Sequence, residues 1–572
     1  MGWLRDTLGR LGGGGPGDAP LHFSRGSSQL QQGQFGAAAD SLERALALAT
    51  PGDGVPLHEA HFLLGRARVG LGELARAAAG FEAAVRIKPD FAEALEEGAR
   101  LLQKLEEHEE AVQWLQQLVQ LRPAAASRFE LARELRLCDR NDEAAVLLGP
   151  LCAEEPRNVD AALLHHHVLV SLGQFDRALA EIERVLKMCE PHADLLVNRS
   201  VPLARLGRHD EALGAIVKAL KLDPAHPRAL ANRASVLLGQ LRVQEAIAAA
   251  QEGLRLHPED PDLHWTLAAA LLLLGDLERG WPEAEWRTRA TGYTRTAPDF
   301  AQPRWQGEGL AGRTILLHAE QGFGDAIQFL RFVPEVARMA GTVLILVPPE
   351  LEPLVAGTLP ANCRIVPRGA ELPPFDFHCP FMSVPAVLGT TLANLPAPVP
   401  YLHAAPEAVT AWQRKLDAGR LNVGVCWSGN PRHFNDRWRS MTLAAMRTLA
   451  AEGCRFFTLQ PQKRPGDEEA LAAWKDAVDT GRELRTYADT SALIQALDLV
   501  ITVDTSVAHL AGALGKPVWV LLPQVPEWRW MLEREDSPWY PSARLYRQEK
   551  RGDWTPVLKR VKNDLAARAR TR

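Results

Sequence analysis

Small residues recur along the first half of the chain at a nearly constant spacing, and this repeat restricts the fold more than any other feature of the sequence. The recurring residues are Ala38, Ala77, Ala111, Ala145, Ala178, Ala212, Ala246 and Gly280. Successive members lie 39, 34, 34, 33, 34, 34 and 34 residues apart. The long first step contains the turn-forming residues 50–54, which indicates a loop insertion in an otherwise regular array. Such a period is typical of repeats in which each unit is one supersecondary element.

Other positions keep the same phase. A second small residue stands twelve positions earlier in the units that carry Gly65, Ala99, Ser200, Ala234 or Ala268. A proline stands twelve positions later at Pro89, Pro123, Pro224 and Pro258. Antiparallel helices approach closely only where side chains are small, and a proline ends the second helix because it lacks a backbone N–H and clashes with the preceding turn. Glycines suited to tight hairpin turns stand at Gly33, Gly72, Gly173, Gly207 and Gly275.

This pattern resembles the tetratricopeptide repeat (TPR), and it stays in phase for about eight units over residues 21–292. The resemblance implies an all-α TPR solenoid, a right-handed superhelix whose concave groove binds a peptide or a partner protein. The alternative is that the array only spaces or dimerises the protein. The fourth unit, residues 126–158, departs most from the pattern. Trp281 and Trp286 in the last unit fit either a capping repeat docked on a second domain or ordinary core packing.

Charge and cysteine content exclude several classes of protein. The chain has 65 Lys and Arg against 70 Asp and Glu, so we expect no nucleic-acid partner unless the solenoid groove is locally basic. The seven cysteines lie far apart without a C-x-x-C pair, which argues against a zinc site or a disulfide framework and fits a cytoplasmic protein. His165, His166 and His167 point in different directions around a helix, so they cannot all ligate one metal. We expect them to face solvent or the groove, and we predict no metal site.

The N-terminal 20 residues contain the glycine run 12–15 and no apolar stretch long enough for a signal peptide or a membrane span. We therefore predict a flexible leader and no transmembrane segment. The alternative for the leader is a short interfacial helix that carries Trp3, Leu4, Leu8 and Leu11.

Beyond a linker, residues 293–311, short β-branched runs alternate with helices. The predicted strands are residues 314–317, 342–347, 423–427, 456–459, 499–503 and 518–522. Such alternation predicts parallel sheets, which bind ligands at the carboxyl ends of their strands. The proline-rich stretch 395–406 divides this α/β module into two Rossmann-like lobes, residues 312–405 and 406–572.

Three segments at predicted strand ends carry candidate chemistry. In the first, Gly322 and Gly324 let the backbone approach a ligand, and Asp325 projects from the start of a helix. The alternative role of Asp325 is that of the helix N-cap. In the second, residues 427–440, Ser428, Arg437 and Arg439 lie in a loop whose fixed cations suit a diphosphate, the alternative being a solvated basic loop.

The third segment follows the predicted strand 499–503. Asp504 ends that strand, Thr505 and Ser506 open a helix, and His509 lies on the first turn of the helix. Backbone N–H groups at such a helix start form a phosphate cradle. The alternatives are that Asp504 only caps the helix and that His509 is a packed core residue.

The second and third segments resemble the nucleotide-binding half of the GT-B glycosyltransferases, and of these the ADP-heptose:lipopolysaccharide heptosyltransferases in particular. The D-T/S-x-x-x-H run with which that family binds the donor diphosphate matches Asp504, Thr505, Ser506 and His509. A family lysine falls at Arg439, and the family's G-D aspartate, the proposed acceptor base, falls at Asp325. The array fused to this module is also similar in architecture to the O-GlcNAc transferases, whose site motifs are not matched here.

The resemblance implies a metal-independent, inverting glycosyltransferase without a cofactor, whose co-substrate is a nucleotide-diphosphate sugar. Its acceptor is a protein or a saccharide selected with help from the array. In this hypothesis Asp325 is the general base, and Arg437, Arg439 and the helix start at Ser506 stabilise the leaving group. The alternative is an interaction scaffold with a catalytically inactive glycosyltransferase-like domain.

An aromatic run near the C-terminus permits two interpretations. Trp528, Trp530, Trp539 and Tyr540 either line the site, where aromatic planes stack on sugars and bases, or pack the last helix against the lobes.

Overall fold

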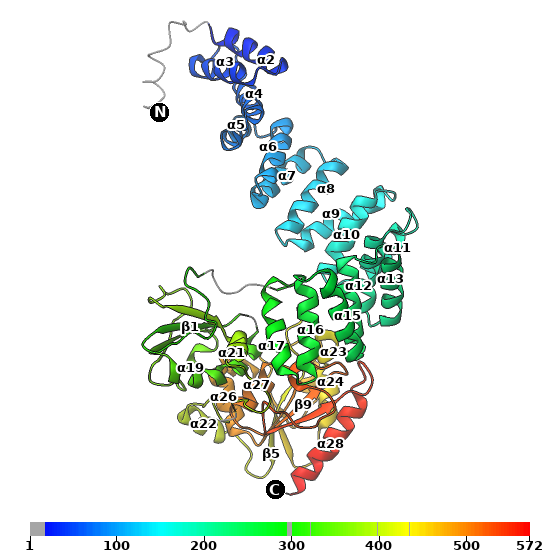
Figure 1. The fold of residues 1–572 in the computed structure, drawn as a ribbon, viewed down its shortest axis with the longest axis vertical. Coiled ribbons are helices and arrows are strands. Elements are labelled where there is room, and N and C mark those ends of the chain that lie inside the picture. Colours follow the sequence, from blue (N-terminus) through cyan, green and yellow to red (C-terminus); the bar gives the residue numbers. More distant parts are fainter. Residues whose placement is uncertain (1–17, 294–299, 321, 397–398, 434, 572) are drawn as a thin grey trace. The chain divides into compact units, whose positions relative to one another are not determined.

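The computed structural model describes residues 18–293, 300–320, 322–396, 399–433 and 435–571. The chain divides into two compact units, residues 1–222 and 223–572, so the boundary falls inside the repeat array. Figure 1 shows the chain coloured along its sequence. Most of the predicted leader, residues 1–17, lies outside the described residues, and α2 begins at Ala19. Within the described ranges, no helix has both the length and the apolar character needed to cross a membrane.

The described part of the array consists of eight helical hairpins. Six lie in the first unit: α2 (Ala19–Gln31) with α3 (Phe35–Leu48), α4 (Leu57–Gly70) with α5 (Leu74–Ile87), α6 (Ala92–Lys104) with α7 (His108–Leu121), α8 (Ala125–Leu137) with α9 (Asn141–Glu154), α10 (Val159–Ser171) with α11 (Phe175–Val185), and α12 (Ala193–Arg205) with α13 (His209–Leu222). Two open the second unit: α14 (Pro227–Gly239) with α15 (Val243–Leu256), and α16 (Pro261–Leu273) with α17 (Leu277–Ala284). The predicted TPR solenoid is confirmed.

Close helix contacts explain the repeated small residues. A Cβ added to Gly65 would lie 2.8 Å from the Phe81 ring and 3.2 Å from the carbonyl oxygen of Ala77, so these two phased positions meet inside one hairpin. In the fourth unit the prediction of Ala145 is wrong by one residue. Ala144 is the fully buried alanine there, and Ala145 is only partly buried. This degenerate unit therefore keeps the packing while its sequence spacing shifts by one.

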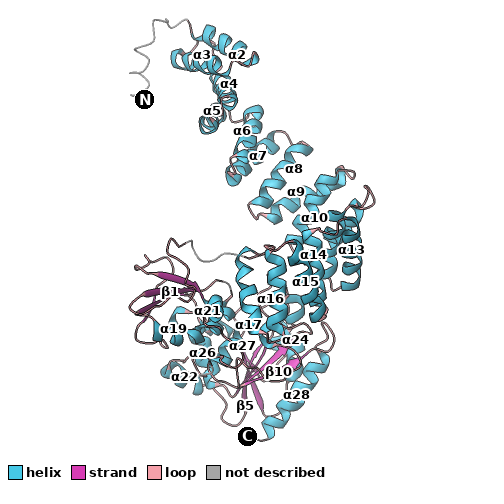
Figure 2. Ribbon diagram, viewed as in Figure 1, coloured by secondary structure: helices cyan, strands magenta, loops and turns pink. Residues whose placement is uncertain are grey.

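The α/β region of the second unit contains two all-parallel sheets (Figure 2, magenta). The first has the order β3-β2-β1-β4, with β1 (Thr314–His318), β2 (Thr342–Leu346), β3 (Cys363–Ile365) and β4 (Phe377–Pro380). The second has the order β10-β9-β8-β5-β6-β7, with β5 (Leu421–Cys426), β6 (Cys454–Thr458), β7 (Ala477–Val478), β8 (Leu499–Val503), β9 (Val518–Leu522) and β10 (Ala543–Arg547). The predicted α/β module is confirmed.

Helices connect these strands, and the last helix follows the last strand. They are α18 (Phe323–Phe329), α19 (Val333–Met339), α20 (Glu352–Ala356), α21 (Val384–Val387), α22 (Pro406–Gln413), α23 (Asp436–Arg439), α24 (Leu443–Met446), α25 (Asp467–Ala472), α26 (Tyr487–Ala496), α27 (Ser506–Ala513) and α28 (Thr555–Arg570). Short 3₁₀ helices are η1 (Glu285–Arg289), η2 (Leu330–Phe332), η3 (Phe381–Ser383), η4 (Arg447–Leu449), η5 (Gly481–Glu483) and η6 (Trp528–Trp530).

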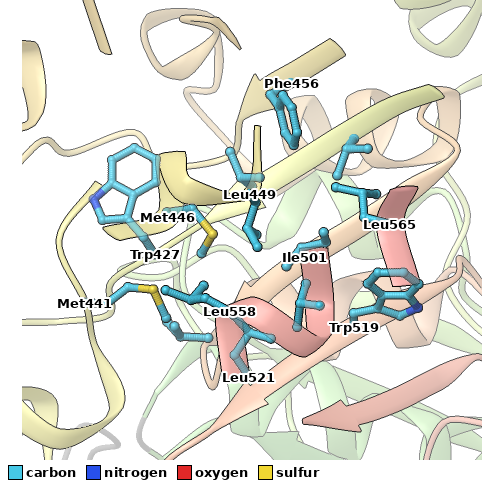
Figure 3. Close-up of a cluster of buried hydrophobic side chains, with 14 of the residues drawn as sticks. Trp427, Met441, Met446, Leu449, Phe456, Ile501, Trp519, Leu521, Leu558 and Leu565 are labelled. Atoms are coloured by element: carbon cyan, nitrogen blue, oxygen red, sulfur yellow. The ribbon is translucent and has the colours of Figure 1, made fainter. Parts of the chain in front are cut away.

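The second sheet is buried on both faces, as parallel sheets usually are. Every residue of β5, β8 and β9 is buried. The core on one side joins strand residues such as Ile501 and Leu521 to Leu558 and Leu565 of α28 (Figure 3). The central strands are thereby held rigidly, and their carboxyl ends have fixed positions.

The last repeat packs on the α/β region within the second unit. Trp281 of α17 is 2% exposed, its Nε1 donates to the carbonyl oxygen of Thr390 at 2.9 Å, and its ring meets Trp528 edge to face at 5.4 Å. Arg287 of η1 donates to Glu320, just after β1, at 2.6 Å, and both side chains are buried. The last repeat is therefore docked on the α/β region through Trp281, whereas Trp286 stacks on His264 within the repeat.

Candidate functional site

Two of the three predicted segments meet where α18 contacts α27. A Cβ on Gly324 would lie 2.9 Å from Cδ2 of His509 and 3.6 Å from Cα of Ser506. Glycine at position 324 therefore lets the first segment lie directly against the helix that carries the third. Gly322 immediately precedes α18 and leaves room beside Asp325, whose Oδ2 would be 3.2 Å from a Cβ at position 322.

Gly322 is the N-cap of α18 and Asp325 lies inside the first turn of that helix, so the alternative of an N-cap role does not describe Asp325. Its Oδ1 accepts a hydrogen bond from Nη2 of Arg529 at 2.5 Å. The Asp325 side chain is 28% exposed, whereas that of Arg529 is 7% exposed. The carboxylate is thus held by a buried cation and still reaches solvent.

Arg529, on η6, joins several acceptors and was not among the predicted site residues. Its Nη1 donates to Oε1 of Glu527 at 2.5 Å, its Nε donates to Oε1 of Gln328, and its guanidinium lies 4.2 Å from the centre of the Trp528 ring. Partial removal of water from the Glu527 carboxyl raises its pKa to about 7. The positive charge of Arg529 opposes this rise in the pKa, and the negative charge of Asp504 adds to it. An arginine and a glutamate inside an aromatic run were the sequence signal for this network.

The third segment forms the end of β8 and the start of α27. Thr505 is the N-cap of α27 and accepts from the N–H of Val507 at 3.3 Å, so the alternative that Asp504 caps the helix is wrong. Oδ1 of Asp504 instead accepts from Nε1 of Trp530 at 2.9 Å, and burial raises the pKa of Asp504. The hydroxyl of Ser506 lies 2.8 Å from that of Tyr487, another residue that the sequence argument missed.

His509 is buried in an aromatic environment. Its Nδ1 lies 2.9 Å from the hydroxyl of Tyr540, and its ring stacks on Trp530 with 5.3 Å between centroids. Burial, and next the positive charges of Arg529 and Arg331, hold the pKa of His509 well below its usual value, so the imidazole is neutral. The packed-core interpretation of His509 agrees with this geometry.

The second segment reaches the third through Arg439. Nη1 of Arg439 donates to the carbonyl oxygen of Asp504 at 3.1 Å, and Gly429 makes room for the guanidinium, since a Cβ there would lie 2.5 Å from Nη2. Strands β5 and β8 are neighbours with Cys426 opposite Thr502, so Ser428 and Asp504 leave the sheet side by side. Within the part of the chain that the structure describes, Ser428 Oγ and Arg439 Nε are buried without a hydrogen-bond partner.

Arg437 differs from Arg439. It is exposed, and its guanidinium lies 4.6 Å from the centre of the Trp438 ring. Arg464, which the sequence argument missed, instead fixes the loop by donating to the carbonyl oxygen of Gly429 at 2.8 Å and to Asp436 at 2.7 Å. The structure therefore brings Ser428 and Arg439 to the third segment and leaves Arg437 at the surface.

The aromatic run packs rather than exposing its ring faces. Trp528 is 5% exposed, and Trp530, Trp539 and Tyr540 are at most 1% exposed. Arg331 lies among these rings, 5.3 Å from the centre of Trp539 and 5.1 Å from that of Tyr540. A cavity of about 430 Å³ beside Leu273, Leu392 and Met531 contains none of the predicted site residues.

Comparison with known families agrees with both parts of the fold. Residues 23–92, 62–126, 163–227 and 231–280 match the tetratricopeptide repeat, and residues 486–550 match "Glycosyltransferase family 9 (heptosyltransferase)". The second match contains Asp504, Thr505, Ser506, His509 and Arg529. The chain thus combines a TPR array with an α/β module in which residues 486–550 are similar to glycosyltransferase family 9, in agreement with the resemblance seen in the sequence.

Individual relatives are more distant. The chain is 28% identical over 331 residues to protein FlbA of Caulobacter vibrioides, which is 51% of this chain and 53% of that protein, so the chain spans about half the length of the curated relative it matches. Among solved structures, YrrB, a TPR protein with an unusual peptide-binding site, is 21% identical, with a TM-score of 0.28 over 30% of this chain and 89% of its own. A TPR protein from Parabacteroides merdae is 16% identical, with a TM-score of 0.30 over 44% of this chain and 99% of its own.

Proposed function

We propose that this protein transfers a sugar from a nucleotide-diphosphate donor to a protein or saccharide acceptor that the repeat array helps to select. The observation that carries the proposal is a set of unmatched hydrogen-bond donors at one sheet edge. Ser428 Oγ and Arg439 Nε are buried without a partner in the described structure, and both belong to the segment that lies against the start of α27. Buried donors without acceptors are costly, and phosphate oxygens supply the acceptors that they lack.

The diphosphate binds at the amino end of α27 in this proposal. Backbone N–H groups at a helix start and the partial positive charge of the helix dipole attract phosphate. Arg439 adds a full positive charge beside that end, which stabilises the leaving diphosphate without a metal ion. We give Arg439 the larger role and Arg437 a peripheral one, because Arg437 is exposed on Trp438.

Asp325 takes the proton of the acceptor hydroxyl in an inverting displacement. Arg529 binds Oδ1 of Asp325 and so orients the carboxylate, while Oδ2 faces the space beside Gly322. The acceptor oxygen attacks the anomeric carbon, the bond to the diphosphate breaks, and the proton passes to Asp325. In this proposal Arg529 is a positioning residue.

A scaffold with an inactive transferase domain is the second candidate, and one observation favours it. Asp325, Asp504 and His509 each have a protein partner, namely Arg529, Trp530 and Tyr540. A purely structural role would satisfy these contacts as well.

A thermal-shift panel of ADP-, UDP-, GDP- and CMP-sugars in EDTA separates the two candidates. We expect one nucleoside-diphosphate sugar to raise the melting temperature of the full chain, because a ligand that binds only the folded state stabilises it. CMP-sugars carry a single phosphate and serve as the comparison. Arg439→Ala should remove the shift, and Arg437→Ala, a change of the same kind on the same helix, should retain most of it. The absence of a shift with every donor would favour the scaffold.

A further inference from the structure

Three consecutive helices of the first unit bring a cysteine, a histidine and a glutamate together. Cys152 comes from α9, His165 from α10 and Glu181 from α11. One ligand-type atom of each, the thiol sulfur, a ring nitrogen and a carboxylate oxygen, lies within 4.8 Å of the other two. Cys152 and His165 are buried, and the Glu181 side chain is 14% exposed. All three belong to the fourth and fifth repeats, far from the α/β module in sequence.

The imidazole of His165 lacks hydrogen bonds, which is unusual for a buried side chain. His165 is 5% exposed, and in the described structure neither ring nitrogen has a hydrogen-bond partner. The nearby carboxylate oxygen, Oε1 of Glu181, is 3.8 Å from Nδ1, too far for a hydrogen bond. A buried polar group without a partner destabilises the folded state, so a ligand that bonded to the His165 imidazole would stabilise it.

The adjacent His166, also buried on α10, does have a hydrogen-bond partner, so a histidine on this helix is not forced to lack one. Nδ1 of His166 lies 2.9 Å from the carbonyl oxygen of Ala178, at the crossing where other repeats carry a small residue. His166 is 1% exposed and His165 is 5% exposed, so the expectation that these side chains face solvent or the groove is wrong for these two histidines. Three successive histidines on one helix cannot share one metal ion, but one of them can share it with residues from neighbouring helices.

We propose that Cys152, His165 and Glu181 form a binding site for a divalent transition-metal ion, zinc by the chemistry of its ligands. Thiolate sulfur, imidazole nitrogen and carboxylate oxygen are the three zinc ligand types in proteins. The two anionic ligands balance the charge of the ion. Nη2 of Arg184 donates to Oε1 of Glu181 at 2.5 Å. This hydrogen bond orients the carboxylate, as the hydrogen-bond partners of metal ligands do in known metal sites. A water molecule fills the fourth position.

Metal binding at this site includes a proton release. Burial raises the pKa of the Cys152 thiol to about 12, so without metal the sulfur keeps its proton. When the sulfur–metal bond forms, the S–H bond breaks and the proton goes to solvent. The bound ion would tie α9, α10 and α11 to one another and stabilise the most degenerate part of the array.

Cobalt(II) titration of the tag-free, chelator-treated full chain tests this proposal. We expect one equivalent of cobalt per chain and a near-ultraviolet charge-transfer band that reports a cobalt–thiolate bond. Cys152→Ser should abolish the band, His165→Gln should weaken binding at least tenfold, and so should Glu181→Gln. Cys138→Ser and His167→Gln are matched controls in the same repeats and should leave the titration unchanged.

The outcomes are distinguishable. Less than one equivalent of cobalt bound to the wild-type chain, or a band that survives in Cys152→Ser, would overturn the proposal. Circular dichroism of each variant checks its fold, and Glu181→Gln, a change at a partly exposed side chain, provides the test if Cys152→Ser does not fold. Zinc should also raise the melting temperature of the wild type by more than that of Glu181→Gln, and an equal rise in both would count against the site.

Discussion

One residue in each hairpin turn has a left-handed backbone conformation. Five of the eight turns have glycine at this position, and three have a residue with a Cβ. Gly33, Gly72, Gly173, Gly207 and Gly275 have φ between 70° and 82°. The equivalent turns of the remaining three units have Glu106, Asp139 and Leu241, with φ of 61°, 56° and 59°. A residue with a Cβ is strained in this region, so these three turns hold strain that glycine would relieve.

Leu241→Gly should therefore stabilise the protein by up to about 1 kcal/mol, since the left-handed conformation costs a leucine roughly that amount. The reverse change, Gly173→Ala, should destabilise it by a similar amount, and no atom lies within 4 Å of the added Cβ, so the effect is confined to the backbone. Urea unfolding midpoints measure both. A lower midpoint for Leu241→Gly would contradict the account of these turns.

Arg529 should matter for stability as well as for the proposed chemistry. Arg529→Met leaves Asp325 and Glu527 without their cation, and we expect a loss of about 2 kcal/mol, less than for fully buried pairs because both carboxylates are partly exposed. Arg534→Met breaks the pair with the exposed Asp536 and should cost less than about 1 kcal/mol. Denaturant unfolding of the two variants gives the comparison, and equal losses would argue against a buried network at Arg529.

At the scale of elements, a buried histidine at the end of β1 should make the stability of the fold depend on pH. His318 is 4% exposed, and its Nε2 lies 3.2 Å from Nδ1 of His378 on β4. Burial, and after it the charges of His378, Arg304 and Arg287, lower the pKa of His318 to about 3. In the unfolded chain the imidazole of His318 is protonated below about pH 6.5, whereas in the folded chain it stays neutral down to about pH 3. Its contribution to the free energy of unfolding is therefore fully present above about pH 6.5 and is lost progressively as the pH falls toward 3.

His318 alone should cost roughly 2 kcal/mol at pH 5 relative to pH 7.5. His318→Gln should remove that part of the pH dependence, while His403→Gln, at an exposed histidine of the same unit, should leave it unchanged. Urea midpoints at the two pH values provide the measurement. An undiminished pH dependence in His318→Gln would show that the buried imidazole is not its source.

Strand prediction succeeded where burial left a clear pattern. All six predicted strands exist, and β8 and β9 match them in both bounds because each is a continuous run of buried residues, apolar except for Thr502. The missed strands β3, β4, β7 and β10 lie at sheet edges or are short, and Cys363, Arg364 and Ile365 of β3 are all partly or fully exposed. An edge strand lacks the two-sided burial that makes a strand visible in a sequence.

At the scale of the whole molecule, the sequence predicted that the candidate segments lie at strand ends, but not the hydrogen bonds that join them. The sequence placed Ser428 and Asp504 after predicted strands, and the pairing of β5 with β8 in the structure brings those two strand ends side by side. The bond from Arg529 to Asp325 joins residues 204 positions apart, and no local pattern encodes such a pair. The Cys152, His165 and Glu181 cluster was missed for the same reason, because spacing along one helix does not report contacts between helices.

The domain boundary at residue 292 stays a prediction. The division into compact units falls at residue 222, and the last two hairpins belong with the α/β module through contacts such as Trp281 with Thr390 and Arg551 with Gly239. The last two hairpins of the array therefore belong to the compact unit that contains Asp325.

Sugar transfer itself tests the central claim most directly. The full chain is incubated in EDTA with a cell extract and the nucleotide sugar that binds it, labelled in the sugar, and label in the macromolecular fraction is counted over time. We predict transfer by the wild type, and a rate at least about a hundredfold lower for Asp325→Asn with donor affinity unchanged. Label that enters no acceptor above the rate seen without the protein would contradict the assignment as a glycosyltransferase.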